Sequence, residues 1–157
     1  MKDFWIRELG LTRHPEGGAF RESYRSALAI PQEQGLRAAS TAIYFLLEEG
    51  DFSAFHRIRY DEIWHFYTGS PLIIVEINGS GEMKQTKLGA DIVQAERFQH
   101  VVPGGTWFAS YALGPYSLVG CTVAPGFDFE DFEMANRNTL ATLFPDHRAI
   151  IEHLTRP

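Results

Sequence analysis

The chain has 157 residues, a formal net charge of −6 and one cysteine. This length fits a single domain over residues 1–157 that is stable without cross-links, and a lone cysteine excludes an internal disulfide. The basic residues are scattered, which argues against nucleic acid as a partner, and the longest apolar runs are too short to cross a bilayer. We therefore expect a soluble cytoplasmic protein without a membrane partner.

The first part of the chain predicts a short helix followed by an edge strand. Apolar side chains recur at helical spacing over residues 4–9, and Gly10 is placed to end that helix. Pro15 and the pair Gly17–Gly18 predict a turn over residues 15–18, or a backbone that passes a neighbouring segment closely. Residues 19–25 alternate between two faces, as in a strand at the edge of a sheet, and residues 27–35 are expected to form a loop.

The middle of the chain predicts many short strands separated by turns. Each run is rich in β-branched and aromatic residues and is bounded by Gly, Pro, Asn or Asp. The predicted strands cover residues 40–47, two segments within 50–69, and residues 72–77, 82–88, 97–102, 106–111 and 116–123. Strands this short, at this spacing, indicate an all-β sandwich or barrel. Residues 136–144 and 146–154 are expected to form two short helices, the second capped by Asp146.

The segment from Gly50 to Gly69 carries the candidate catalytic residues. Its sequence, GDFSAFHRIRYDEIWHFYTG, reads as two strands around a tight connection. His56 lies on the first strand and Glu62 begins the second, so a hairpin brings an imidazole and a carboxylate close together. Such a pair can perform acid–base chemistry or supply two ligands to a metal ion.

This segment resembles the first signature of the cupin superfamily, G-x5-H-x-H-x3or4-E-x6-G. Four residues match in identity and spacing, and Ile58 replaces the second histidine. The second signature, G-x5-P-x-G-x2-H-x3-N, is less complete. It retains Pro103 and Gly105, while Phe108 stands in place of its histidine.

A narrower resemblance covers the chain from about Leu11 to the last helix. The segments that carry it are RHPEGGAFRESYRS, STAIYFLL, DEIWHFYTG, VVPGGTWF and SLVGCTVAPGFDFEDFE. Together they are similar to the uncharacterised DUF985 (Cupin_5) family of cupins. The resemblance implies a double-stranded β-helix (the cupin jelly roll) with short helices at its N- and C-termini, and a homodimer. It implies no catalytic assignment, because the family has no established reaction.

The resemblance also bears on metal binding, because most cupins hold a divalent metal with three histidines and one glutamate. This chain keeps His56 and Glu62, while Ile58 and Phe108 supply apolar surface instead of ligands. Two protein ligands make a weak site. No metal cofactor is therefore expected, and His56 and Glu62 are the ligands if one binds. Strand alternation places His65 on the face opposite to Glu62, where we expect it to be hydrogen-bonded on the outside.

The predicted pocket lining is largely apolar and aromatic. The candidate ligand-binding residues are Tyr44, His56, Ile58, Glu62, Trp64, Phe66 and Phe108. An apolar cavity with few polar groups suits a small organic ligand. For any single aromatic residue, packing in the core is the simpler interpretation.

Two other features receive structural interpretations. Cys121 is interpreted as a buried structural thiol. The acidic segment GFDFEDFE is interpreted as a loop that leads into a helix, with Phe127, Phe129 and Phe132 packed beneath it.

Three functions remain open at this point. The first is binding of a small organic molecule. The second is metal-independent isomerisation or epimerisation of a sugar-like compound, with His56 as base and Glu62 as its partner. The third is a metal-dependent enzyme with a depleted site. Burial shifts the pKa values of His56 and Glu62, in directions that the sequence leaves open. In a purely structural interpretation, Glu62 anchors His56 or Arg57.

Overall fold

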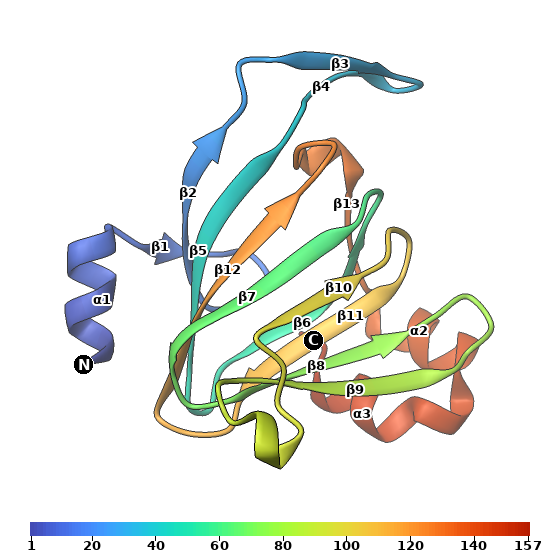
Figure 1. Ribbon diagram of the computed structural model, residues 1–157. Helices are drawn as coiled ribbons and strands as arrows, with labels where there is room; N and C mark the ends of the chain where they lie inside the picture. The colour runs from blue at the N-terminus through green and yellow to red at the C-terminus, as the bar shows by residue number, and fades with distance from the viewer.

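The computed structural model describes all residues 1–157 and consists of two β-sheets that face each other, a separate hairpin and short helices near both ends of the chain (Figure 1). The six-stranded sheet contains, in spatial order, β1 (Thr12–Arg13), β2 (Ala19–Arg25), β5 (Thr41–Glu48), β12 (Tyr116–Val123), β7 (Glu62–Gly69) and β10 (Gln99–Val102). The five-stranded sheet contains β13 (Phe132–Met134), β6 (Phe52–Ile58), β11 (Trp107–Ala112), β8 (Leu72–Ile77) and β9 (Met83–Leu88). Neighbouring strands are antiparallel, which confirms the predicted all-β jelly roll.

The remaining elements lie outside the two sheets. The hairpin consists of β3 (Ala29–Gln32) and β4 (Gly35–Ala38), and it projects at the top of Figure 1. The helices are α1 (Lys2–Leu9), α2 (Arg137–Leu143) and α3 (Arg148–His153), with 3₁₀ turns at Ile92–Gln94, Phe129–Asp131 and Pro145–His147. No helix is long and apolar enough to cross a membrane.

Most predicted elements are confirmed, including the first helix, which ends at Gly10 in the left-handed conformation. The predicted loop over residues 27–35 is wrong, because β3 and the first residue of β4 lie there. Pro31 is tolerated in β3 since this strand pairs only with β4 and leaves its other edge free. The predicted Asp146 cap is also wrong. Pro145 begins a 3₁₀ turn that contains Asp146, and α3 starts afterwards without a side-chain cap.

Three buried clusters form a layered core. One fills the space between the sheets and includes Phe45, Trp64 and Phe108. A second joins the five-stranded sheet to α2 and α3, and a third joins the six-stranded sheet to α1. The cluster between the sheets leaves a cavity near Thr41 and Glu62, where β5 and β7 begin. This cavity is the candidate functional site.

Candidate functional site

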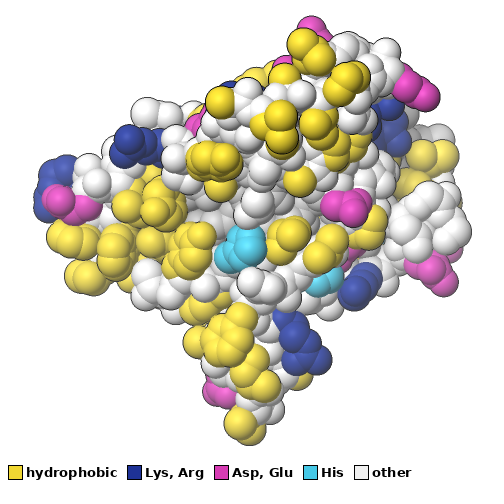
Figure 2. Space-filling model, turned by 45° about the horizontal axis from the view of Figure 1, so that its top comes forward, with side chains coloured by type: hydrophobic (Ala, Val, Ile, Leu, Met, Phe, Trp, Pro, Cys, Tyr) yellow, Lys and Arg dark blue, Asp and Glu magenta, His cyan; other side chains and the backbone are white.

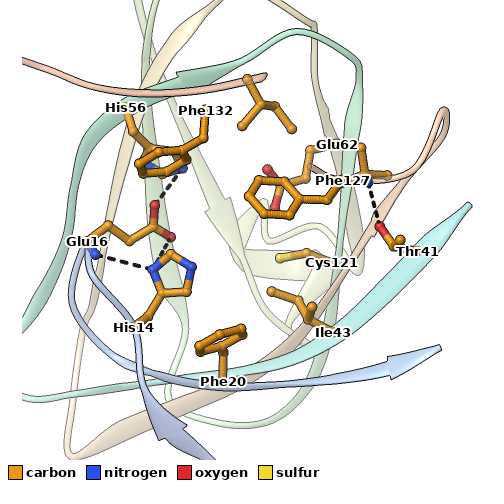
Figure 3. Close-up of a pocket in the computed structure, with 12 residues that line it drawn as sticks. His14, Glu16, Phe20, Thr41, Ile43, His56, Glu62, Cys121, Phe127 and Phe132 are labelled. Atoms are coloured by element: carbon orange, nitrogen blue, oxygen red, sulfur yellow. Dashed lines mark hydrogen bonds and ion pairs between the residues drawn. The ribbon is translucent and has the colours of Figure 1, made fainter. Parts of the chain in front are cut away.

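The cavity between the sheets has a volume of about 50 Å³ (Figure 3). Its walls come from four strands of the six-stranded sheet, from β6 and β13 of the five-stranded sheet, and from two segments outside the regular strands. The twelve lining residues are His14, Glu16, Phe20, Thr41, Ile43, His56, Ile58, Glu62, Cys121, Val123, Phe127 and Phe132. Seven of them are hydrophobic, and the rest place two carboxylates and two imidazoles in one small space. This mixture matches the usual make-up of a small-molecule site.

Glu16 reaches the cavity because the turn before β2 lies directly against the five-stranded sheet. The carbonyl oxygen of Glu16 accepts a hydrogen bond from the Ala54 amide at 2.8 Å. Gly17 follows with a φ of 112°, and a Cβ atom there would collide with the carbonyl oxygen of Phe52. Arg156, near the C-terminus, donates to Phe52 O at 2.8 Å and closes the outside of this turn. A glycine is therefore required for the close approach that directs Glu16 inward.

His56 and Glu16 form a buried ion pair. Nδ1 of His56 lies 2.7 Å from the carbonyl oxygen of Ala54 and donates to it, so Nε2 carries a proton only in the imidazolium form. Nε2 lies 3.0 Å from Oε2 of Glu16. Burial opposes the charge on His56, but the Glu16 carboxylate outweighs it and raises the pKa of His56. Burial likewise opposes the charge on Glu16, and the His56 imidazolium outweighs it and lowers the pKa of Glu16.

The Glu16 carboxylate is held by groups of the chain itself. His56 and the Ser53 hydroxyl are its hydrogen-bonding neighbours, and both lower the pKa of Glu16. Its Oε2 atom is buried against them and has almost no accessible surface. The charged partner offsets part of the cost of burying this carboxylate.

His14 adds a neutral imidazole to the same wall. Its Nδ1 accepts a hydrogen bond from the backbone amide of Glu16 at 3.2 Å, so the hydrogen of the neutral ring resides on Nε2. Burial lowers the pKa of His14, although the Glu16 carboxylate acts in the opposite direction. In Figure 3 the ring lies beside Glu16 and above Phe20, at the edge of the cavity.

Glu62 lies across the cavity from this group, at the start of β7. Burial raises the pKa of Glu62 to about 7, with His56 acting to lower it and Glu16 to raise it. A carboxyl group in this range holds a proton for part of the time at neutral pH. The thiol of Cys121 is beside it, and burial together with Glu62 raises the pKa of Cys121. That thiol is buried and free, in agreement with the structural interpretation.

An aromatic cap covers the cavity, formed by residues 126–132. The Phe127 amide donates to Oγ1 of Thr41 at 2.9 Å, and the Phe127 carbonyl oxygen accepts from Arg25 at 3.0 Å. Phe132 begins β13 and stacks on the ring of His56 at a centroid distance of 5.3 Å. The predicted loop leading into a helix is therefore a 3₁₀ turn followed by a short strand, and two of its phenylalanines cover the site.

The structure places three of the seven candidate ligand-binding residues on the cavity wall: His56, Ile58 and Glu62. Trp64 and Phe108 point to the interior but lie deeper, inside the cluster between the sheets, and Phe66 packs against that cluster. Tyr44 points to the outer side of the six-stranded sheet, where its ring meets Tyr67 at a centroid distance of 6.0 Å. Alternation along β5 makes Ile43, rather than Tyr44, the lining residue.

The sequence did not predict that His14 and Glu16 line the cavity. The signal was the pair Gly17–Gly18, which indicated a close backbone approach without showing which neighbouring side chain it directs inward. His65 behaves as expected on the outside, with Nε2 at 2.8 Å from Oγ1 of Thr122.

Apolar side chains stand at two of the positions where the cupin signatures have metal ligands. No group of three or more histidine, cysteine, aspartate or glutamate side chains is arranged to hold a metal ion. Ile58 lines the cavity, and the ring of Phe108 packs against His56 at a centroid distance of 4.1 Å. The Nε2 atom of His56 faces Glu16. The side chains present can instead bind polar groups or exchange protons with them.

Comparisons with known proteins agree with this fold. Residues 3–135 match the family model described as Cupin superfamily (DUF985). The uncharacterized protein YML079W of Saccharomyces cerevisiae is 33% identical over 143 residues, which cover 80% of this chain and 71% of the yeast protein.

Solved structures give the same result. A hypothetical protein from Leishmania major is 36% identical with a TM-score of 0.93, over 99% of this chain and 98% of that one. Protein SO0799 from Shewanella oneidensis is 42% identical with a TM-score of 0.93, over 99% of this chain and 97% of that one. Oxalate decarboxylase from Bacillus subtilis has a TM-score of 0.60 at 15% identity, over 90% of this chain and 36% of that one, which is a likeness of fold alone.

Proposed function

This chain belongs to the DUF985 (Cupin_5) family of the cupin superfamily, and we propose that it binds a small organic molecule in the cavity between its sheets. The supporting observation is a cavity of about 50 Å³ whose wall brings two carboxylates and two imidazoles together beside an aromatic cap. Such convergent polar groups can fix the orientation of a bound ligand. The aromatic cap provides the apolar surface for the rest of the molecule.

Blocking the cavity is expected to abolish binding. Ile43→Phe places a larger side chain on the wall, and we expect fragment binding to be lost at a cost of about 1–3 kcal/mol in stability. The measurement is a screen of small neutral, basic and acidic fragments, followed through amide chemical shifts of β5 and β12. Tyr44→Phe is the matched control. The Tyr44 side chain points outward, so removal of its hydroxyl group should leave binding unchanged. Fragments that bind both variants equally well would contradict the proposal.

A second candidate is metal-independent isomerisation or epimerisation of a sugar-like compound. The observation that favours it is Glu62, whose pKa of about 7 allows it both to give and to accept a proton near neutral pH. The raised pKa of His56 makes this residue a better stabiliser of developing negative charge than a base. Glu62 is therefore the better base of the two.

This candidate predicts exchange of a carbon-bound hydrogen with solvent. Candidate sugars incubated with the protein in D₂O should gain deuterium, and Glu62→Gln should abolish the gain because an amide cannot carry the proton. Mass spectrometry of the recovered sugars measures the exchange. A panel of aldoses and ketoses that gains no deuterium with the wild-type protein would rule out this activity on them.

We further propose that the protein forms a homodimer through the outer side of its six-stranded sheet. Figure 2 shows hydrophobic side chains on this side of the molecule. Tyr24, Ile63, Tyr67 and Val101 are among the exposed large hydrophobic residues, and Ile63 and Val101 are direct cross-strand partners. We expect Ile63→Glu to halve the mass measured by light scattering, because a charge cannot be buried there without a partner. A monomer mass for the wild-type protein at micromolar concentration would exclude the dimer.

A further inference from the structure

The polar groups that surround the cavity accept more hydrogen bonds than they donate. The carboxyl group of Glu62 lines the cavity and has only the Cys121 thiol as a hydrogen-bonding neighbour. The His56 imidazolium balances one carboxylate, so ionisation of Glu62 leaves one unpaired negative charge. The neutral His14 is the exception, because it can donate a hydrogen bond through Nε2. It carries no charge. A ligand that donates hydrogen bonds and carries positive charge complements this set.

The apolar walls favour the same kind of group. Phe20, Phe127 and Phe132 line the cavity, and the negative face of an aromatic ring attracts a nearby cation. No lysine or arginine lines the cavity itself. A hydrogen bond from the Phe127 amide to Oγ1 of Thr41 holds the aromatic cap in place. A cation that enters therefore meets carboxylates on one side and aromatic rings on the other.

The opening of the cavity continues this charge pattern. A groove shares Phe20, Thr41, Ile43 and Phe127 with the cavity and extends past Glu22 and Asp128. Its single arginine, Arg25, is paired with Glu22 at 2.6 Å and donates to the cap at 3.0 Å, so its charge is already compensated. An anionic ligand would have to pass Asp128 and then lie beside Glu62, and no cation of the groove or the cavity is paired with either carboxylate, so its entry has an electrostatic cost.

From this arrangement we infer that the cavity binds a protonated amine, with the ammonium group hydrogen-bonded to Glu62 and covered by Phe127 and Phe132. The inference rests on the proposed function and names the chemical class of the ligand. The ammonium group supplies a stronger hydrogen-bond donor than the Cys121 thiol and the positive charge that balances Glu62. The cavity holds only a few non-hydrogen atoms beyond this group, so a larger amine extends into the groove past Phe127.

Three probes of nearly equal size separate charge from shape: ethylamine, ethanol and acetate. Each is titrated into isotope-labelled protein at about pH 8, where Glu62 is mostly ionised. The ring resonances of His14 and His56 report binding at the cavity itself, because both rings line it. We expect ethylamine to shift these resonances saturably and to bind about tenfold or more tightly than ethanol, with no binding of acetate.

Two isosteric variants complete the experiment. Glu62→Gln removes the charge without changing the shape and should weaken ethylamine binding about tenfold or more. Glu76→Gln is the matched control, because this buried carboxylate is paired with His100 at 2.6 Å and does not line the cavity. Ethanol or acetate binding as tightly as ethylamine would overturn the ammonium inference and leave the proposed small-molecule site intact. If none of the three probes shifts the histidine resonances and the fragment screen also finds no binder, both fail together.

Discussion

Replacing Gly17 with alanine is expected to destabilise the fold by about 3 kcal/mol or more and to remove Glu16 from the cavity. The φ of 112° disfavours every residue with a Cβ atom, and this atom would collide with the Phe52 carbonyl oxygen. The obstacle is backbone, so it cannot rotate away as a side chain would. The turn must move outward, and Glu16 moves with it. Urea denaturation measures the loss of stability, and the pKa of His56, followed by NMR titration, reports the loss of its partner.

Alanine variants at two other glycines separate the conformational cost at Gly17 from the cost of the collision with Phe52. Gly50 has a φ of 82° with open space around it, so Gly50→Ala should show the conformational cost alone, about 1–2 kcal/mol. Gly79 has neither a positive φ nor a neighbour within 4 Å, and Gly79→Ala should be nearly neutral. Equal losses in the variants at Gly17 and Gly50 would show that the contact with Phe52 has no effect on stability.

Glu62→Gln is expected to stabilise the protein above neutral pH by about 3 kcal/mol. Burial raises the pKa of Glu62 from 4.5 to about 7, so the folded state keeps a proton that the unfolded chain has lost. A carboxyl group whose pKa is higher in the folded state does not destabilise the protein at pH values below its pKa in the unfolded chain. The loss in the free energy of unfolding grows as the pH rises toward its pKa in the folded state. A difference of about 2.5 pKa units corresponds to about 3 kcal/mol. Glutamine has the same shape and no proton to lose.

Comparison of two pH values isolates this effect. At about pH 4.5 the wild-type protein and Glu62→Gln should unfold with similar free energies, and at about pH 8 the variant should be the more stable one. The charges that face Glu62 from neighbouring segments, those of Glu16 and His56, are retained in both proteins. Glu76→Gln again serves as the control, since its loss breaks the contact with His100 and should give no gain at either pH. A constant difference between wild type and Glu62→Gln across this range would contradict the raised pKa.

The fold and one half of the site could be predicted from local patterns. His56, Ile58 and Glu62 lie in a hairpin whose alternation is visible in the sequence, so their inward orientation follows from the period of a strand. Trp64 has the correct orientation but fills the core, because depth along a strand depends on how the sheets pack. Glu16 and Phe132 reach the site through contacts with β6, which begins 36 residues after Glu16 and lies still further from Phe132. Such contacts leave no periodic signal in a single sequence.

The residues that line the cavity lie far apart in the chain, so they are synthesised at different times. Glu16 and His56 are synthesised early, whereas the aromatic cap and β13 follow only after the other strands of the jelly roll, and Arg156 follows these. Until the cap has been synthesised, the wall of the cavity that carries Glu16 and His56 has no cover. Contacts between segments this distant form slowly, because a long loop must close before they are gained. The cavity is therefore complete only after residues 127–132 have docked onto β5 and β6.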